Sequence, residues 1–476
     1  MKNKTTCLLA CLMLLFIVPS LNAQNITLLK GAVKDSVPIN DSISESFAIY
    51  LPKDYNSGKK WPIVFVFDPD GKGLNVTRLF LQALEGQNFI IASSNNISRK
   101  DSLLINLEKA TRLFNKVLTT FPIDEKAIYS AGLDEGALVA SAMPAIISAI
   151  DGVLAVEDVW VNSEFLVQNL TKHTVIGFVD NMSNSKYEFR EKFRLLNSFK
   201  YPAYYYEYDG NGTWPSSNLI AHAMGGFKLQ KMLNGGGVKD PVVIDNLFKS
   251  ELETAESWYR KMDFYKANEL LDLMLTKYKY FDKKDEIKDL QKKIRKEKGF
   301  KQQRSLYNSA EALEREMRIE LTYLLQEDFN YFDFENLGWW SQKMNEIDEL
   351  KKSKNPAEAD MGNRLEDYLQ TYAHNKFYNI FSKKNASLDQ KIFTAVLTTI
   401  FDREDPEAYF SIISLSAQDG DYYTALLYLE DLLKVGYKDL EALYDIPETL
   451  DLKLSPEFNK LIKKYLGTSK YYNIPN

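Results

Sequence analysis

The sequence contains very little cysteine and histidine. Its two cysteines, Cys7 and Cys11, both lie near the N-terminus of the 476-residue chain, and histidine occurs only 3 times. If the N-terminal segment is removed, the remaining chain can form no disulfide and has no thiol nucleophile or cysteine ligand for a metal. An imidazole base can then come only from His173, His222 or His374.

Outside its N-terminus the chain lacks a long apolar run. Lys2 and Lys4 precede an apolar stretch from Cys7 to Val18, and the small residue Ala23 follows. This arrangement is typical of a secretory signal peptide, and the apolar stretch is short for a membrane span. We therefore expect cleavage after Ala23 and a mature chain without a transmembrane segment. The expected location is the periplasm or the outer membrane of a Gram-negative bacterium.

The charge balance is mildly acidic. The formal net charge is −6, and it becomes −8 when Lys2 and Lys4 leave with the signal. Such a charge argues against nucleic acid or an anionic membrane surface as the main partner. No HExxH, EF-hand, P-loop or GxGxxG pattern occurs, so the motifs of common metal and nucleotide sites are missing. We predict neither a cofactor nor a bound metal.

Residues 24–240 alternate between apolar runs and helical stretches. The run at 61–67 is almost continuously apolar, and the run at 88–94 has an apolar centre, as expected for strands that are buried on both faces of a sheet. Helical patterns separate such runs, for example at 104–121 and 185–199. Strands that alternate with helices predict a mainly parallel sheet with helices on both of its faces.

Strand patterns stop near a segment rich in glycine and proline at 234–241, which marks a boundary. Beyond it, the stretches 257–271 and 416–429 resemble each other: each has a small or acidic turn, an aromatic residue, then alanine and apolar residues at helical spacing. That pattern is typical of a tetratricopeptide (TPR) hairpin. Residues 300–400 do not fit the repeat, so an irregular helical bundle is the alternative. The predicted organisation is a signal peptide (1–23), an α/β domain (24–240) and a TPR-like helical domain (244–476).

One segment of the α/β part has the pattern of a nucleophile elbow. An apolar strand from residue 127 leads into a turn with Gly132, Asp134 and Gly136 at alternate positions. In such an elbow a strained strand-to-helix turn exposes one side chain above the sheet. The glycines are needed because a Cβ beside the nucleophile would clash in so tight a turn. Serine usually occupies the central position, and this chain has Asp134.

A second loop strengthens the pattern. Residues 208–215 resemble the Gly-Gly-His-x-Trp-Pro loop that carries the catalytic histidine in many esterases, with Trp214 in place and Gly212 at the histidine position. With the elbow and the stretches 65–73 and 91–96, the chain resembles exported α/β-hydrolase-fold esterases that carry a TPR tail. The resemblance implies an α/β-hydrolase fold. Members of that superfamily use Ser–His–acid chemistry, with backbone N–H groups that hold the oxyanion.

The nucleophile position lacks the usual chemistry. Asp134 has no proton for a base to remove, although a carboxylate can attack directly, as in the epoxide hydrolases and haloalkane dehalogenases that share the fold. The resulting ester would need a water activated by histidine, and Gly212 cannot supply a base. The resemblance therefore implies a hydrolase frame without its nucleophile and base.

The sequence does not assign the base and the acid of a triad to single residues. His222 is the nearest replacement base, but it follows the loop by about fifteen ångströms if the intervening stretch is helical. His173 precedes a strand and His374 belongs to the helical tail. Asp180 lies where a strand should end and suits the acid, whereas another alignment of the next helix puts Asn184 there.

Glu135 adds a third possibility beside Asp134. The two carboxylates could act as an acid/base pair, or bind a cation together with Asp68 or Asp70. Alternatively, Glu135 is a solvated residue at the start of a helix, where negative charge is favourable for both neighbours.

The sequence therefore favours a degenerate, non-catalytic α/β-hydrolase-like protein. Its old active-site cleft and the concave face of its helices would bind or scaffold a protein, peptide or glycan of the envelope, because stacked hairpins expose a long concave surface. The alternative is an esterase or epoxide-hydrolase-like enzyme with Asp134 as nucleophile, and a weaker one is a metal-dependent activity. A fold does not by itself establish a function.

Overall fold

The computed structural model describes residues 28–168, 172–210, 212–235 and 239–472. The predicted signal peptide, with both cysteines, lies outside the described residues. Contacts divide the described residues into two compact units: those within 28–155, 160–174 and 216–224 belong to the first, and those within 156–159, 175–215 and 225–472 to the second. Among the described residues, no helix has the length and apolar character that a membrane span requires.

The described part of the chain contains a sheet of 8 strands in the order β1-β2-β4-β3-β5-β6-β7-β8. The strands are β1 (Val33–Pro38), β2 (Ser46–Tyr50), β3 (Trp61–Phe67), β4 (Ile90–Ser94), β5 (Ile123–Leu133), β6 (Ile150–Val156), β7 (Thr174–Asp180) and β8 (Ala203–Tyr208). β2 pairs in antiparallel fashion with β1 and β4, whereas β3 is parallel to β4 and β5, and β7 is parallel to β8. The prediction of a mainly parallel sheet is confirmed.

The centre of the sheet is as apolar as its sequence suggests. Val64 of β3 pairs with Ile91 of β4 on one side and with Tyr129 of β5 on the other. All three side chains are buried. A strand flanked on both sides and covered on both faces has no solvated face, and for this reason β3 reads as a continuous apolar run.

The strand order also explains why helices cover both faces of the sheet. The crossover from β3 to β4 and the one from β4 to β5 run in opposite directions, because β3 lies between β4 and β5. Right-handed crossovers then put α2 (Gly73–Ala83) and α3 (Leu103–Thr120) on opposite faces. α4 (Glu135–Ala142) follows β5 after a sharp turn and packs against α3. This is the architecture of the α/β-hydrolase fold, as predicted.

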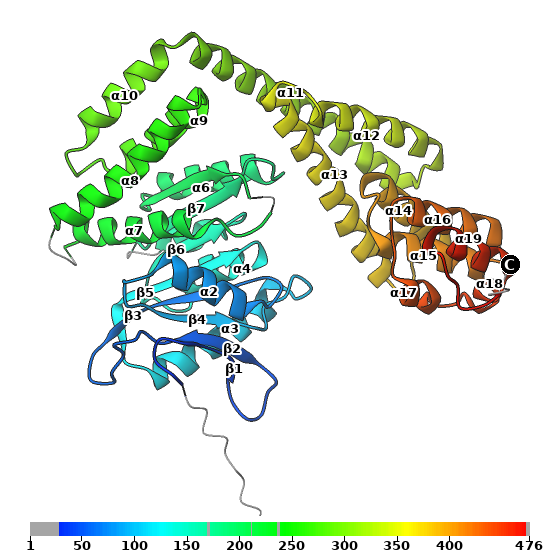
Figure 1. Ribbon diagram of the computed structural model, residues 1–476, viewed down its shortest axis with the longest axis horizontal. Helices are drawn as coiled ribbons and strands as arrows, with labels where there is room; N and C mark the ends of the chain where they lie inside the picture. Colours follow the sequence, from blue (N-terminus) through cyan, green and yellow to red (C-terminus); the bar gives the residue numbers. More distant parts are fainter. Residues whose placement is uncertain (1–27, 169–171, 211, 236–238, 473–476) are drawn as a thin grey trace, which may run out of the picture. The chain divides into compact units, whose positions relative to one another are not determined.

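Every described element after Pro241 is helical (Figure 1). Three helices follow the last three strands in turn: α5 (Ser163–Gln168) follows β6, α6 (Lys186–Ser198) follows β7 and α7 (Ser217–Leu233) follows β8. The region itself consists of α8 (Pro241–Arg260), α9 (Phe264–Lys277), α10 (Lys284–Lys296), α11 (Lys298–Tyr331), α12 (Leu337–Lys351), α13 (Pro356–Ser382), α14 (Leu388–Phe401), α15 (Pro406–Gln418), α16 (Tyr422–Lys434), α17 (Leu440–Asp445), α18 (Leu450–Lys453) and α19 (Pro456–Leu466). Short 3₁₀ turns occur at Met143–Ala145 and Phe334–Asn336. The predicted all-helical region is confirmed.

The two stretches with similar sequence form similar hairpins, α8–α9 and α15–α16. In each hairpin a residue with positive φ ends the first helix, Met262 at +62° and Gly420 at +78°. An aspartate follows, Asp263 or Asp421, and its side chain accepts a backbone N–H in the first turn of the next helix. An N-cap of this kind stabilises a helix start by about 1 kcal/mol. The shared turn explains the shared sequence pattern, and the TPR assignment stays a prediction.

Candidate functional site

A single residue joins β5 to α4. β5 ends at Leu133, α4 begins at Glu135, and Asp134 between them has φ 48° and ψ −117°. The carbonyl oxygen of Asp134 accepts the N–H groups of Ala137 at 2.8 Å and Leu138 at 3.1 Å, which starts the helix. A non-glycine residue in such a conformation costs about 1–3 kcal/mol. The backbone therefore has the strained turn of a nucleophile elbow.

The two elbow glycines are required by close backbone contacts. A Cβ on Gly132 would lie 1.9 Å from the carbonyl oxygen of Gly136, and a Cβ on Gly136 would lie 2.0 Å from that of Phe67. No side chain fits at such distances, so α4 can start directly beside the ends of β5 and β3 only if both residues are glycine.

Arg99 holds the carboxylates around the elbow. Its Nη1 lies 2.8 Å from Oδ2 of Asp134 and 3.2 Å from Oε2 of Glu135. Its Nε lies 3.1 Å from Oδ1 of Asp70, and Nζ of Lys72 lies 2.8 Å from the other oxygen of Asp70. Three carboxylates and two cations thus form one ion-pair network. Glu135, which could have been merely solvated, is paired.

The charges in this network stabilise one another. Burial alone would lower the pKa of the Arg99 guanidinium, but Asp134, Glu135 and Asp70 outweigh that effect and raise it. The hydrogen bond from Lys72 holds the pKa of Asp70 below its usual value, against the effect of partial burial and with help from Arg99. An attack by the Asp134 carboxylate would have to disrupt its ion pair with Arg99.

The loop after β3 uses its own amides. Oδ1 of the buried Asp68 accepts the N–H groups of Asp70 at 3.0 Å and Lys72 at 3.2 Å. The N–H of Gly71 donates to the carbonyl oxygen of Asp68 at 3.1 Å, and Pro69 has no N–H. In hydrolases of this fold, an N–H of this loop and the N–H after the nucleophile form the oxyanion hole. Here the amides of residues 70–72 already have partners inside the loop.

The same contacts bear on the cation site considered for Asp134, Glu135 and an aspartate at 68 or 70. Asp68 binds backbone amides, while the other three carboxylates are directed at Arg99 and Lys72. In the described part of the chain, no group of 3 or more histidine, cysteine or acidic side chains could hold a metal ion. The residues at the elbow therefore suit a basic side chain better than a cation from solution.

Asp180, the predicted acid, is the last residue of β7 and is 1% exposed. Its Oδ2 accepts the N–H groups of Gly210 at 3.0 Å and Gly212 at 3.1 Å, and its Oδ1 accepts that of Met182 at 2.9 Å. Its own N–H donates to Oε1 of Glu157 at 2.8 Å. The carboxylate is thus directed at the loop in which an esterase would have its histidine, but it binds the backbone of that loop.

Gly212, Trp214 and His222 lie at or near the loop bound by Asp180. Gly212 has φ +68°, and a Cβ built on it would meet no atom within 4 Å. Trp214 is half-buried in the same loop. His222 is also half-buried, and it lies on α7 rather than in the loop. The position of Gly212 thus has room for a side chain, although the backbone there favours glycine.

The other two histidines have environments of opposite kind. His173 is buried directly before β7, at the end of the strand away from Asp180, and burial together with Lys172 lowers its pKa to about 4. His374 lies on α13, where Nε2 is 3.3 Å from Asp402 and 3.5 Å from Asp405. Those two carboxylates raise the pKa of His374 to about 9, against the effect of burial.

Asn184, the alternative acid position, belongs to a different set of contacts. Its backbone N–H and its side-chain Nδ2 donate to Oδ2 of Asp367 at 2.7 and 2.8 Å, and Nδ2 also donates to Thr371 at 3.1 Å. Its carbonyl oxygen accepts from Arg318. These partners lie on α13 and α11, so Asn184 connects the loop after β7 to the helices.

Arg99 is a residue of this site that the sequence did not indicate. This residue lies in the loop after β4, and its N–H donates to the carbonyl oxygen of Pro69 at 3.1 Å, which brings it to the elbow. Nothing in its local sequence distinguishes it from a solvated arginine. The position could have been suspected only from the need of Asp134, Glu135 and Asp70 for a counter-charge.

Comparison with known proteins adds little to this description. No protein-family model matches the chain, and no curated protein matches it. An esterase from Pyrobaculum calidifontis is 11% identical over 41% of this chain and 86% of its own, with a TM-score of 0.33. Esterase 2 from Thermogutta terrifontis is 11% identical over 44% and 98%, also at 0.33. S-formylglutathione hydrolase from Staphylococcus aureus is 9% identical over 39% and 92%, at 0.31. These scores are too low to carry an argument, so the fold assignment rests on the sheet and the elbow.

Proposed function

We propose that this chain is a degenerate α/β-hydrolase-like protein that binds or scaffolds other molecules and has no hydrolytic turnover. The observation that carries the proposal is the pairing of Asp180 with the amides of Gly210 and Gly212. A triad needs an imidazole between the acid and the nucleophile. At this position the acid binds the backbone directly.

The nucleophile side supports the same conclusion. The carboxylate of Asp134 forms an ion pair with Arg99 at 2.8 Å. In the loop after β3, the amides of Asp70, Gly71 and Lys72 already donate hydrogen bonds to Asp68. A carboxylate nucleophile forms an ester that a base-activated water must hydrolyse. Without that base, even a successful attack would leave an ester on Asp134 that is not hydrolysed.

A binding role in the cell envelope follows from the rest of the sequence. The N-terminal residues 1–23 have the pattern of a signal peptide, and the similar hairpins α8–α9 and α15–α16 support a TPR-like helical region. Arrays of helical hairpins present concave surfaces that suit protein, peptide or glycan ligands. We therefore propose a periplasmic or outer-membrane-associated binding module.

One observation favours the second candidate, a hydrolase with Asp134 as nucleophile. The elbow retains its strained backbone, with Asp134 at φ 48°, and strain of this kind often marks a functional site. His222 is the nearest residue in sequence that could serve as the base.

Turnover measurements separate the two candidates. The purified chain is incubated with short-chain aryl esters and with epoxides, beside the variants Asp134→Ala and Asp134→Ser/Gly212→His. We expect no turnover by the wild type. We expect esterase activity in the double variant only if the remaining oxyanion donors suffice, since a Cβ at position 212 meets open space.

Two controls sharpen the result. Arg99→Met removes the ion pair between Arg99 and Asp134 without providing a base, so it should stay inactive. Mass spectrometry of wild type after incubation with epoxide would detect a stalled ester on Asp134. Wild-type turnover that disappears in Asp134→Ala, and in His222→Gln, would overturn the proposal and establish the hydrolase.

A further inference from the structure

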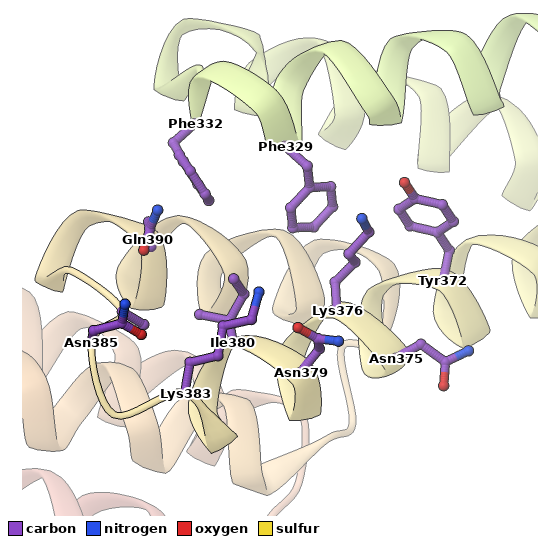
Figure 2. Close-up of a pocket in the computed structure, with 11 residues that line it drawn as sticks. Phe329, Phe332, Tyr372, Asn375, Lys376, Asn379, Ile380, Lys383, Asn385 and Gln390 are labelled. Atoms are coloured by element: carbon purple, nitrogen blue, oxygen red, sulfur yellow. The ribbon is translucent and has the colours of Figure 1, made fainter.

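The helical region contains a pocket that takes no part in the elbow or in the loop bound by Asp180. Its volume is about 810 Å³, and it lies between the end of α11, the second half of α13 and the start of α14 (Figure 2). This volume is within the range of ligand pockets in proteins, about 300–1,000 Å³. The lining mixes aromatic rings with carboxamides and two lysines.

The charge of the pocket is of one sign. Lys376 and Lys383 line it, and no aspartate or glutamate does. Within the described residues neither lysine forms an ion pair. Two cations without a counter-charge at the wall of a concave site favour an anionic ligand.

Lys376 is held in place by aromatic rings. Its Nζ lies 5.3 Å from the ring centroid of Phe329 and 5.3 Å from that of Tyr372, and Figure 2 shows it between the two rings. Cation–π contacts of this kind restrain the ammonium group before a ligand arrives. They also cover the ring faces on which a sugar would stack, and Phe329 is only 8% exposed. The arrangement suits a carboxylate better than a neutral glycan.

Two asparagine side chains lie four residues apart on α13, at a spacing that matches an extended peptide. Asn375 and Asn379 are exposed, line the pocket, and make no side-chain hydrogen bond within the described residues. Four residues along a helix correspond to a rise of about 6 Å. An extended peptide presents an N–H and a C=O on the same edge every second residue, about 6.6–6.8 Å apart. Each carboxamide can donate to one such C=O and accept from one such N–H.

We propose that this pocket binds an extended peptide segment with acidic side chains. Lys376 and Lys383 would pair with its carboxylates, while Asn375 and Asn379 bind its backbone. The inference rests on the binding role proposed above and specifies the ligand class. It involves no residue of the elbow or of the loop bound by Asp180.

Fluorescence polarisation with the full chain tests this inference. The probe is a fluorescein-labelled hexapeptide of alternating valine and aspartate, and the matched neutral peptide has asparagine in place of aspartate. We expect the acidic peptide to bind at least about tenfold more tightly than the neutral one, with an affinity that falls as salt is raised.

The variants identify the site. Lys376→Gln should weaken binding of the acidic peptide by about tenfold, the worth of one charged contact, and Lys376→Arg should restore most of it. Lys384→Gln is the matched control, because Lys384 is exposed and neighbours Lys383 but does not line the pocket. It should leave binding unchanged. Thermal melts of all variants confirm that each is folded.

Several outcomes would overturn the inference. They are the absence of binding at protein concentrations up to about 300 μM, equal binding of the two peptides, and equal effects of Lys376→Gln and Lys384→Gln. Displacement of the peptide by an equal concentration of succinate or of an acidic oligosaccharide would also overturn it, since the ligand would then be another anion. Turnover by Asp134 is measured separately, so a missing peptide site and a hidden hydrolase activity give different results.

Discussion

Asp134 and Asp180 occupy two positions that matter in a hydrolase, and the protein treats them differently. Asp134 has a strained backbone, a side chain that is 27% exposed, and a side-chain partner, Arg99. Asp180 is 1% exposed and accepts three backbone N–H groups. At the elbow a strained backbone carries a side chain that forms an ion pair. At the acid position a buried side chain binds the backbone of its own turn and of a neighbouring loop.

The two sets of contacts differ in energy. A partly exposed ion pair contributes about 0–1 kcal/mol to stability, whereas a hydrogen bond to a buried charged group contributes about 1.5–3 kcal/mol. The loop that contains Gly210 and Gly212 should therefore depend strongly on Asp180, and the elbow should depend only weakly on Asp134. Substitutions can test that difference directly.

The largest effect is expected for Asp180→Asn. The substitution turns one oxygen into an N–H₂ donor, which then faces either the amides of Gly210 and Gly212 or the amide of Met182. We expect the free energy of unfolding to fall by about 2–4 kcal/mol. Denaturant unfolding measures the loss, and hydrogen exchange at Gly210 and Gly212 should accelerate in the same variant.

Asp209→Asn is the matched control, in the same loop. Asp209 is 60% exposed and pairs with Lys266 at 2.9 Å, so its loss should cost less than about 1 kcal/mol. If the two substitutions lower the free energy of unfolding equally, the burial of Asp180 and its three hydrogen bonds to amides are not what stabilises the loop.

A smaller difference in stability is expected between two substitutions at the elbow. Asp134→Gly removes the ion pair with Arg99 but relieves the backbone strain, whereas Asp134→Ala removes the ion pair and keeps the strain. Glycine should be more stable than alanine by about 0.5–1 kcal/mol, after allowing for the greater freedom of glycine in the unfolded chain. Urea midpoints of the two variants measure the difference.

The neighbouring residue supplies the control for that comparison. Glu135 is the first residue of α4 and does not have a positive φ. Alanine should be the more stable substitution there, because glycine is a poor helix former. If glycine is less stable than alanine at both positions, the strain at Asp134 is smaller than its backbone angles indicate.

The sequence predicted the elements whose cause is local. β3 and β4 are apolar because they are buried on both faces, and Gly132 and Gly136 are required by the turn itself. The capped turn before Asp263 follows a residue pattern that the second hairpin repeats. In each case the residues of the element themselves carry the pattern that predicts it.

The contacts that decide the site are not local, and the sequence did not reveal them. Arg99 reaches Asp134 because the loop after β4 is tied to Pro69. The position of Asp180 was predictable, but not its pairing with Gly212, since that depends on how two loops meet. The pocket around Lys376 is formed by three helices in a stretch that fits no repeat.

The smallest expected effects are changes in the pKa of two further aspartates. Asp70 belongs to the ion-pair network at the elbow, and Asp209 belongs to the loop bound by Asp180. The pKa of Asp70 is lowered from 3.8 chiefly by the hydrogen bond from Lys72. Burial raises the pKa of Asp209, but hydrogen bonds from Lys266 and Asn181 outweigh it and the net shift is again downward. Because both folded pKa values are depressed, the stability they contribute is present at neutral pH. It is lost as the pH falls below about 4.

Removing the lysines should separate the two environments. Lys72→Met should return the pKa of Asp70 only part of the way to 3.8, because Arg99 still pairs with it. Lys266→Met should return the pKa of Asp209 further toward its usual value, because the closest remaining donor to that carboxylate is then the neutral amide of Asn181. Carbon NMR of selectively labelled aspartate, recorded from about pH 2 to pH 6, measures both values. A larger rise at Asp70 than at Asp209 would reverse the comparison. It would mean that Arg99 contributes less to the lowered pKa of Asp70 than its contact with that carboxylate indicates.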